Sequence, residues 1–503
     1  MDFMRDIAIS IHNTRTEIFY APEDLLNMID VMTSYIDPAF EGLTSSVDQY
    51  NDLDRDHAWD GKHHFLRRPK TKPPWINTGL RDIVVECCQR MGFTYQVHDL
   101  RVAPEEDVPH YFEALPLWPH QEEAVTSVLR NPDGVIVMPP RSGKTLTLLE
   151  AFRRRNQPTL WIAPTSSIVD QTVERALEWF HERDVQKLTT NPTPDQYNAM
   201  LGIVTAAAAS KLPQEYMDTR AMLVGDELHH FLANNAWGSG LIKKTAHIYY
   251  RYGMTGTFFR SNGDDLAMHA FLSRKLYTVA TTELMDKGYL VPTYVAFVKI
   301  EAPTVRRKHG NRKFHGEGGI GYEGIHTHEY RNNVVADTVA YLHGLGRTVL
   351  VLVGTKVQGR ILEKLIRERI PPASRHTEFE AAEFVSTDRK SVNRRILRAF
   401  TEGQEVRVLI GTSLIGEGID LPSADALVYA RGEKAPVSLV QGWFRVCTAS
   451  PGKEFGLIVD FADTHHRTLE AHSRDRWNLA SQEPIFRLSY LENPHDLKKW
   501  CEG

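Results

Sequence analysis

The segment GVIVMPPRSGKTLTLLEAF, residues 134–152, decides how the first large domain folds. Apolar residues run into two prolines, and the turn then continues through Ser142, Gly143, Lys144 and Thr145. Leucines at helical spacing follow, so the segment predicts a buried strand, a tight turn and a helix. Backbone N–H groups of such a turn bind phosphate oxygens, while Lys144 reaches the β- and γ-phosphates and the Thr145 hydroxyl binds Mg²⁺. The segment thus predicts a nucleoside triphosphate site, although Met138 stands where the consensus has its first Gly.

An acidic pair supports this prediction against a chance Gly-Lys-Thr at a helix start. The run AMLVGDELHH ends an apolar strand with Asp226 and Glu227. A carboxylate at the tip of a strand in the same sheet holds Mg²⁺, and its neighbour orients and deprotonates the attacking water. We expect Asp226 to bind Mg²⁺ with Thr145, and Glu227 and Lys144 to act in ATP hydrolysis. The alternative is a pair of acids that caps a helix.

Length and composition define the class of protein. A chain of 503 residues is long enough for roughly three domains, and 42% hydrophobic with 24% charged residues is typical of a soluble globular protein. The net charge of −5 argues against a protein that coats nucleic acid, so a nucleic-acid partner needs local basic patches. No zinc site is expected from the spacing of the cysteines, which are Cys87, Cys88, Cys447 and Cys501. Without a signal sequence or a long apolar run, we expect a cytoplasmic protein with no membrane partner.

The pattern of apolar runs predicts the architecture. Before residue 110, RDIAISIHNTRTEIFY reads as a strand pair, and PEDLLNMIDVMTSYI and GLRDIVVECCQRMGF read as helices. After it, two series of buried runs alternate with helices, which is typical of tandem α/β domains with parallel sheets that join near residues 285–300. We expect four parts: an N-terminal α+β domain (1–110), an ATP-binding lobe (111–290), a second lobe (291–480) and a short helical tail (481–503).

With DELH in place, the chain resembles the superfamily 2 helicases of the DEAD/DEAH type over roughly residues 115–470. The resemblance implies two RecA-like domains that use ATP and Mg²⁺. LWPHQEEAV resembles the Gln motif, which implies that Gln121 lies near the adenine. LIGTSLIGEGIDLP resembles a second-lobe motif that implies Gly418 and Asp420 as nucleotide contacts. The other implied roles are strand contacts by Pro164, Thr165, Thr205, Thr355 and Thr412, and coupling by His229, Thr255 and Thr257.

The last motif departs from the family pattern Q-x-x-G-R-x-x-R. The segment QGWFRVCTASPGK supplies Gln441 and Arg445 as catalytic candidates but has Thr448 in place of the second arginine. Three readings stay open. Arg445 alone supports a slow motor, or Arg431 or Lys434 completes the site, or the protein binds ATP and DNA but hydrolyses ATP poorly.

The N-terminal part of the sequence narrows the resemblance to one group of helicases. HAWDGKHHFL and the following helix resemble the N-terminal domain of UvsW-type phage DNA helicases, and related modules of XPB-like helicases engage duplex DNA. The resemblance implies an ATP-dependent helicase or translocase for branched or forked DNA, in a bacterial or phage-infected cell. The basic stretches at 64–72 and 305–313 fit a phosphate track or a solvated loop equally well. RNA stays open as a substrate, and the sequence identifies no protein partner.

Two other functions stay open at this point. Similar cores occur in motor subunits of restriction or defence complexes, although the chain shows no nuclease constellation of its own. A DNA-binding ATP switch that clamps without unwinding is the alternative from a different class, and Thr448 is its main support.

Overall fold

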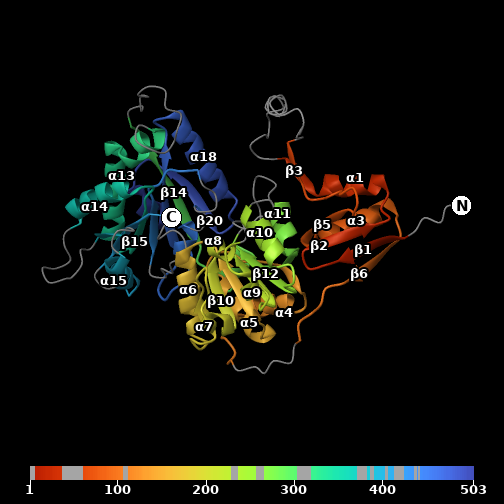
Figure 1. Cartoon of the computed structure of the whole chain (residues 1–503). Coiled ribbons are helices and arrows are strands. Elements are labelled where there is room, and N and C mark those ends of the chain that lie inside the picture. The colour runs from red at the N-terminus through yellow and green to blue at the C-terminus, as the bar shows by residue number, and fades with distance from the viewer. Residues whose placement is uncertain are drawn as a thin grey trace. The chain divides into compact units, whose positions relative to one another are not determined.

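Figure 1 shows the computed structural model of the chain. The structure describes residues 6–36, 61–105, 112–227, 236–256, 265–302, 319–370, 382–385, 390–402, 406–412, 424–434, 439 and 442–502. The chain forms two units, residues 1–139 with 143–279, and residues 140–142 with 280–503. Unit 1 carries an N-terminal region and a first α/β lobe, and unit 2 carries a second α/β lobe.

The N-terminal region of unit 1 is built around a four-stranded sheet of order β5-β2-β1-β6. Its strands are β1 (Ile7–Ile11), β2 (Arg15–Phe19), β5 (Trp75–Asn77) and β6 (Tyr95–Asp99), and a separate pair is formed by β3 (Ser34–Ile36) and β4 (Lys62–His64). Helices α1 (Glu23–Met32) and α3 (Arg81–Met91) share a core with every second residue of β1, because strand side chains alternate between faces. The predicted strand pair and both predicted helices are confirmed. Strands β5 and β6 escaped prediction because β5 is three residues long and β6 is largely exposed.

The first lobe is a seven-stranded sheet of order β13-β7-β12-β11-β8-β10-β9, and its strand pairs are parallel. Its strands are β7 (Asp133–Val137), β8 (Thr159–Ala163), β9 (Val185–Lys187), β10 (Leu201–Thr205), β11 (Met222–Asp226), β12 (Tyr250–Thr255) and β13 (Lys275–Thr278). The helices are α4 (Pro119–Leu129), α5 (Lys144–Arg155), α6 (Ser166–Leu177), α7 (Pro194–Asn198), α8 (Ala206–Ala209), α9 (Gln214–Met217), α10 (Ala236–Lys244) and α11 (Asp265–Leu272). Parallel pairing brings the carboxyl ends of β7, β12 and β11 to one edge of the sheet, where ligands bind in such folds.

Unit 2 repeats this design with a parallel sheet of order β16-β17-β15-β18-β19-β14-β20. Its strands are β14 (Thr293–Ile300), β15 (Val349–Leu352), β16 (Ala382–Val385), β17 (Val408–Gly411), β18 (Ala426–Tyr429), β19 (Gly456–Asp463) and β20 (Phe486–Leu491). The helices are α12 (Thr281–Asp286), α13 (Glu329–Gly344), α14 (Lys356–Arg369), α15 (Lys390–Thr401), α18 (Arg467–Ser481) and α19 (Asp496–Glu502), with a π-helix at Tyr322–His326 and a 3-10 helix at Phe444–Val446. The prediction of two tandem parallel-sheet domains is confirmed.

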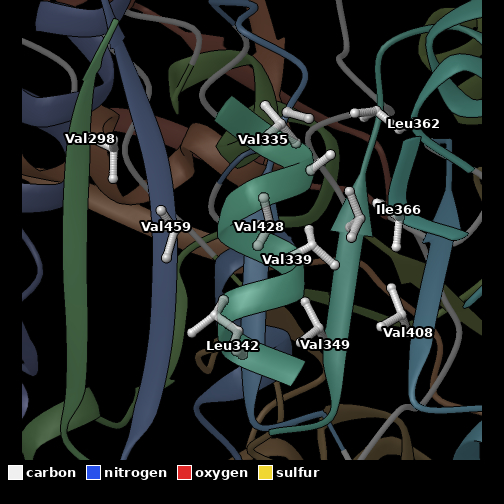
Figure 2. Close-up of a cluster of buried hydrophobic side chains, with 14 of the residues drawn as sticks. Val298, Val335, Val339, Leu342, Val349, Leu362, Ile366, Val408, Val428 and Val459 are labelled. Atoms are coloured by element: carbon white, nitrogen blue, oxygen red, sulfur yellow. The ribbon is translucent and has the colours of Figure 1, made fainter. Parts of the chain in front are cut away.

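The core of unit 2 lies where helices α13 and α14 cover the sheet, as Figure 2 shows. Val335, Val339 and Leu342 of α13 belong to one buried cluster with Val349 of β15 and Val428 of β18. The α13 residues are spaced by three or four positions, so they share the face of the helix that meets the sheet.

The C-terminal tail differs from its prediction. Residues 486–491 form the edge strand β20, which pairs with β14, and the helix α19 follows it. The expectation of a purely helical tail was wrong because the pairing of β20 depends on a strand almost 200 residues earlier, which local periodicity does not report. In the described part of the chain, no helix has both the length and the apolar character that a membrane span needs.

Candidate nucleotide site

The turn after β7 has the backbone that a phosphate loop needs. Strand β7 is buried throughout and leads into Met138, whose N–H donates to the carbonyl oxygen of Thr255 at 3.1 Å. Arg141 and Gly143 both have positive φ angles, 71° and 81°, and Gly143 is the N-cap of α5. The predicted sequence of strand, tight turn and helix is confirmed, with Lys144 and Thr145 opening the helix. Ser142 lies in the same turn.

Gln121 of α4 is bound to this turn. Its side chain is 2% exposed, and its Oε1 accepts from the N–H of Trp118 at 2.8 Å. Its Nε2 donates to the carbonyl oxygen of Gly143 at 3.4 Å. A Cβ on Gly143 would lie 1.9 Å from Gln121 Nε2 and would displace that amide, and the φ of 81° itself favours glycine at this position. The structure places Gln121 against the phosphate loop, and its contact with adenine stays a prediction.

The acidic pair reaches the same edge of the sheet through strand register. Asp226 of β11 is paired with Met254 of β12, and Met254 is paired with Ile136 of β7. Through these two pairs, Asp226 lies level with Ile136, the residue before the last of β7. Lys144 Nζ lies 3.9 Å from Glu227 Oε1, with side-chain exposures of 11% and 15%. The structure therefore brings Lys144, Asp226 and Glu227 together, as the sequence predicted.

The pKa of Asp226 is perturbed at this edge of the sheet. Burial and the neighbouring carboxylate of Glu227 raise the pKa of Asp226 to about 7, and Lys144 opposes that rise. Asp226 is 5% exposed, and Glu227 adopts a left-handed φ of 48° that side chains rarely tolerate. Two adjacent carboxylates in a buried site are a suitable environment for a divalent cation.

The donor set fits Mg²⁺ better than a metal held by protein ligands alone. Within the described residues, no three His, Cys, Asp or Glu side chains are grouped to hold a metal ion. Mg²⁺ instead takes one or two carboxylates together with water and phosphate oxygens. Asp226 and the hydroxyl of Thr145, which is partly exposed at the start of α5, would hold it here.

The threonines predicted to contact a nucleic-acid strand are helix N-caps. The Oγ1 atoms of Thr165, Thr205 and Thr355 accept backbone N–H groups three residues on, at 3.3, 3.3 and 3.2 Å. Thr205 ends β10 and is registered with Ala163 of β8, so the caps after these two strands are neighbours. Pro164 and Thr412 are partly exposed at strand ends. The positions fit the prediction, but nucleic-acid contact stays a prediction.

Other predicted residues are placed only in part. Thr255 ends β12, is fully buried and accepts the Met138 N–H. Five further candidates lie outside the described residues: His229, Thr257, Gly418, Asp420 and Gln441. The basic stretch 305–313 and Trp59, the tryptophan of HAWDGKHHFL, also lie outside them.

The last motif lies in unit 2. Arg445 is on the 3-10 helix and is 5% exposed. Thr448 forms an isolated bridge with Leu290, and its Oγ1 is buried without a hydrogen-bond partner among the described residues. The proposed substitutes are ion-paired within their own unit, Arg431 with Glu433 at 2.9 Å and Lys434 with Asp475 at 3.2 Å. The choice between Arg445 and these two residues as the transition-state cation stays a prediction.

The sequence prediction missed Asp133, the first residue of β7. Its carboxylate is buried and accepts from Arg81 at 2.6 and 2.8 Å and from Arg101 at 2.9 Å. The available signal was a single acid at the start of an otherwise apolar run, which is unusual in a buried parallel strand.

Comparison with known proteins agrees with the motifs. The family described as "Type III restriction enzyme, res subunit" matches residues 114–260, and the "Helicase conserved C-terminal domain" matches residues 332–447. A putative helicase of a Sulfolobus islandicus filamentous virus is 23% identical over 56% of this chain, and the match spans 47% of that protein. The DNA 3'-5' translocase XPB2 of Sulfurisphaera tokodaii is 24% identical over 62% of this chain and 74% of its own length.

Solved structures show the same fold. A fragment of a putative HsdR subunit of a type I restriction enzyme from Vibrio vulnificus covers 90% of this chain and 83% of its own, with a TM-score of 0.52 and 14% identity. The crystal structure of T4 UvsW covers 97% of this chain and 100% of its own, with a TM-score of 0.44 and 17% identity. The chain belongs to superfamily 2 of the ATP-dependent helicases, as its motifs predicted, and is related to the XPB helicases.

Proposed function

We propose that the protein is an ATP-dependent DNA helicase or translocase that remodels branched or forked duplex DNA. The observation that carries this proposal is the convergence of Lys144, Asp226 and Glu227 at one edge of the first-lobe sheet. The names of its relatives, a DNA 3'-5' translocase and a DNA 3'-5' helicase, support DNA as the substrate.

The site supports hydrolysis of ATP by positioning and electrostatics. N–H groups of the turn and the Lys144 ammonium bind the β- and γ-phosphates. Glu227 orients a water in line with the γ-phosphorus and accepts its proton, and ADP leaves as the phosphoryl group is transferred. Mg²⁺ held by Thr145 and Asp226 spreads the negative charge when bound. Arg445 is proposed as the cation that stabilises the transferring group.

The proposed DNA contacts are made to the backbone. Thr165 and Thr205 cap helices that begin at the carboxyl edge of the first-lobe sheet, and Thr355 caps α14 in unit 2. Such contacts follow a strand without reading its sequence. They also discriminate sugars poorly unless a 2′-hydroxyl is read, so RNA stays an alternative substrate.

A second candidate is the motor subunit of a restriction or defence complex. Its support is the family description that matches residues 114–260, together with the HsdR fragment among structures of the same fold. A partner would then supply the nuclease. A third candidate, an ATP switch that clamps DNA, is supported by Thr448 in place of an arginine.

One assay separates the three candidates: ATP turnover with and without forked DNA, run beside strand displacement. The proposal expects turnover stimulated by the fork and displacement of a strand. Stimulated turnover without displacement, with a nuclease that co-purifies, would favour the restriction motor, and binding of ATP and DNA without turnover would favour the switch. Lys144→Ala should abolish turnover, whereas Lys187→Ala, an exposed lysine on the edge strand β9, should not.

A further inference from the structure

The N-terminal region forms ion pairs with the buried amino end of β7, opposite the phosphate loop. Arg81 is the first residue of α3, and its guanidinium donates to both carboxylate oxygens of Asp133, at 2.6 and 2.8 Å. Arg101 follows β6 and donates to the same carboxylate at 2.9 Å. The side chains of Arg81, Arg101 and Asp133 are 12%, 7% and 6% exposed. The strand that leads into the phosphate loop is thus hydrogen-bonded at its other end to Arg81 and Arg101, which precede Asp133 by 52 and 32 positions in the chain.

Helix α11 of the first lobe is part of the N-terminal core. Its Ala267 and Ala270 are buried in the same hydrophobic cluster as Ile9 of β1 and as Cys87 and Cys88 of α3. This cluster therefore does not end at the boundary between the N-terminal region and the lobe. The sheet strand that precedes α11 in the chain is β12, which ends beside the phosphate loop.

The backbones of the N-terminal region and of the first lobe are also in close contact. Gly79, in the short 3-10 helix at Thr78–Leu80, approaches the C-terminal end of α11. A Cβ on Gly79 would lie 1.7 Å from the carbonyl oxygen of His269 and 2.8 Å from the nitrogen of Ser273. Backbone atoms cannot turn away as a flexible side chain does, so any side chain here would force the two parts to separate.

We propose that the N-terminal region, in its described residues 6–36 and 61–102, opens and closes as one cooperative unit with the first lobe. Gly79 and Arg81, the latter through its ion pair with Asp133, act as positioning residues through which a nucleotide at the phosphate loop stabilises the N-terminal region. Because linkage is reciprocal, a ligand that binds the N-terminal region would change nucleotide affinity by the same factor. The nucleotide part rests on the proposed function, and the cooperative unit does not.

Cys87 and Cys88 are natural probes of this unit. Both thiols are 0% exposed inside the N-terminal core, so an alkylating reagent reaches them only when that core opens. Labelling of the full chain, read by mass spectrometry, is measured with and without ADP. If the unit is cooperative, ADP at 100 times its Kd should slow labelling about 100-fold, because binding to the closed form lowers the open population.

Hydrogen exchange supplies a measurement that does not depend on nucleotide. In the chain without ligand, the opening free energy reported by Cys87 and Cys88 should equal that of the amides in β7 and β8. Separate ADP binding measurements distinguish the two failures. If ADP does not bind, the proposed function fails, and exchange still decides the cooperative unit. If ADP binds and labelling is unchanged, the inference fails.

Variants test the positioning residues. Gly79→Val and Arg81→Ala should label faster, and the ratio of labelling rates without and with ADP should fall towards 1. Arg90→Ala is the matched control, because Arg90 lies on the same helix with 55% exposure and should keep the wild-type ratio. Faster labelling at an unchanged ratio in both test variants would reduce the two residues to a structural role and overturn this part of the proposal.

Discussion

Buried acids lie near both ends of strand β7, Asp133 on the strand itself and Asp226 at the end of β11, and their electrostatic surroundings differ. At the amino end, the single carboxylate of Asp133 faces the guanidiniums of Arg81 and Arg101. At the carboxyl end, Asp226 and Glu227 lie beside one ammonium, that of Lys144 at 3.9 Å. At the first site Arg101 also pairs with Asp99, so every charged group named there has an ion-pair partner. At the second site burial and the neighbouring Glu227 raise the pKa of Asp226.

This difference separates an anchor from a candidate catalytic site. A buried charge that is paired and hydrogen-bonded holds two parts of a fold in register. Burial, with the neighbouring Glu227, raises the pKa of Asp226 to about 7, and clusters of this kind mark functional sites. Glu227 and Arg141 also hold left-handed φ angles of 48° and 71° at the carboxyl end.

Removing the ammonium from the carboxyl end should have the largest effect. Lys144→Ala loses a phosphate contact and the ammonium 3.9 Å from Glu227, so ATP turnover should fall by roughly 10³-fold or more, as when a phosphate-stabilising arginine is lost. Steady-state phosphate release measures it. Turnover within about tenfold of wild type, in a chain that folds normally, would contradict the role of the phosphate loop.

Asp133→Asn should break the anchor at the amino end. The substitution removes the carboxylate partner of the Arg81 guanidinium in a buried site, while Arg101 keeps its pair with Asp99, and the loss costs about 3–5 kcal/mol. Urea unfolding followed by fluorescence measures the loss. Glu86→Gln is the control, since Glu86 pairs with Arg90 at the surface, and it should cost less than about 1 kcal/mol. An equal loss of unfolding free energy in both variants would show that the ion pairs of Asp133 stabilise the fold no more than a surface pair does.

Replacing Asp by Asn at the carboxyl end, at Asp226, should change the free energy of unfolding in the opposite direction. At pH 8, without metal or nucleotide, Asp226→Asn removes a buried charge and should raise the free energy of unfolding by about 1–2 kcal/mol while abolishing Mg²⁺-dependent turnover. Because the folded pKa is raised to about 7, wild type loses stability as the pH rises through that value. The gain should shrink as the pH falls from that value and should disappear at about pH 4, below which the carboxyl is protonated in the unfolded chain as well. A variant that is less stable than wild type at pH 8 would show that the site is balanced.

The smallest expected effect extends the comparison to unit 2. Thr448→Arg restores the cation that the family pattern has at this position, and DNA-stimulated ATP turnover should rise by up to about tenfold. Thr448→Lys is a useful comparison, because lysine restores the charge without the planar fork of arginine and should gain less. No gain in a chain whose wild-type turnover is already fast would show that another group completes the site.

Local pattern was enough for much of the fold and for the centre of the site. The apolar run of β7, the Gly-Lys-Thr at the start of α5 and the acids at the end of β11 are each signals within a few residues. The strands that escaped prediction, such as β6 and β20, are short edge strands with exposed side chains, and their partners lie far away in the sequence. Exposed edges carry little hydrophobic periodicity, so their existence depends on the sheet that they join.

By itself the sequence determined the phosphate loop, the acidic pair and the family, because short-range chemistry and motif order encode them. Tertiary structure decided which charges lie together: Arg81 and Arg101 reach Asp133 across 52 and 32 residues, and Lys144 comes within 3.9 Å of Glu227, beside the buried Asp226. The physical reason is that electrostatic compensation depends on distance and burial in space, which strand register and helix packing set and which no local pattern contains.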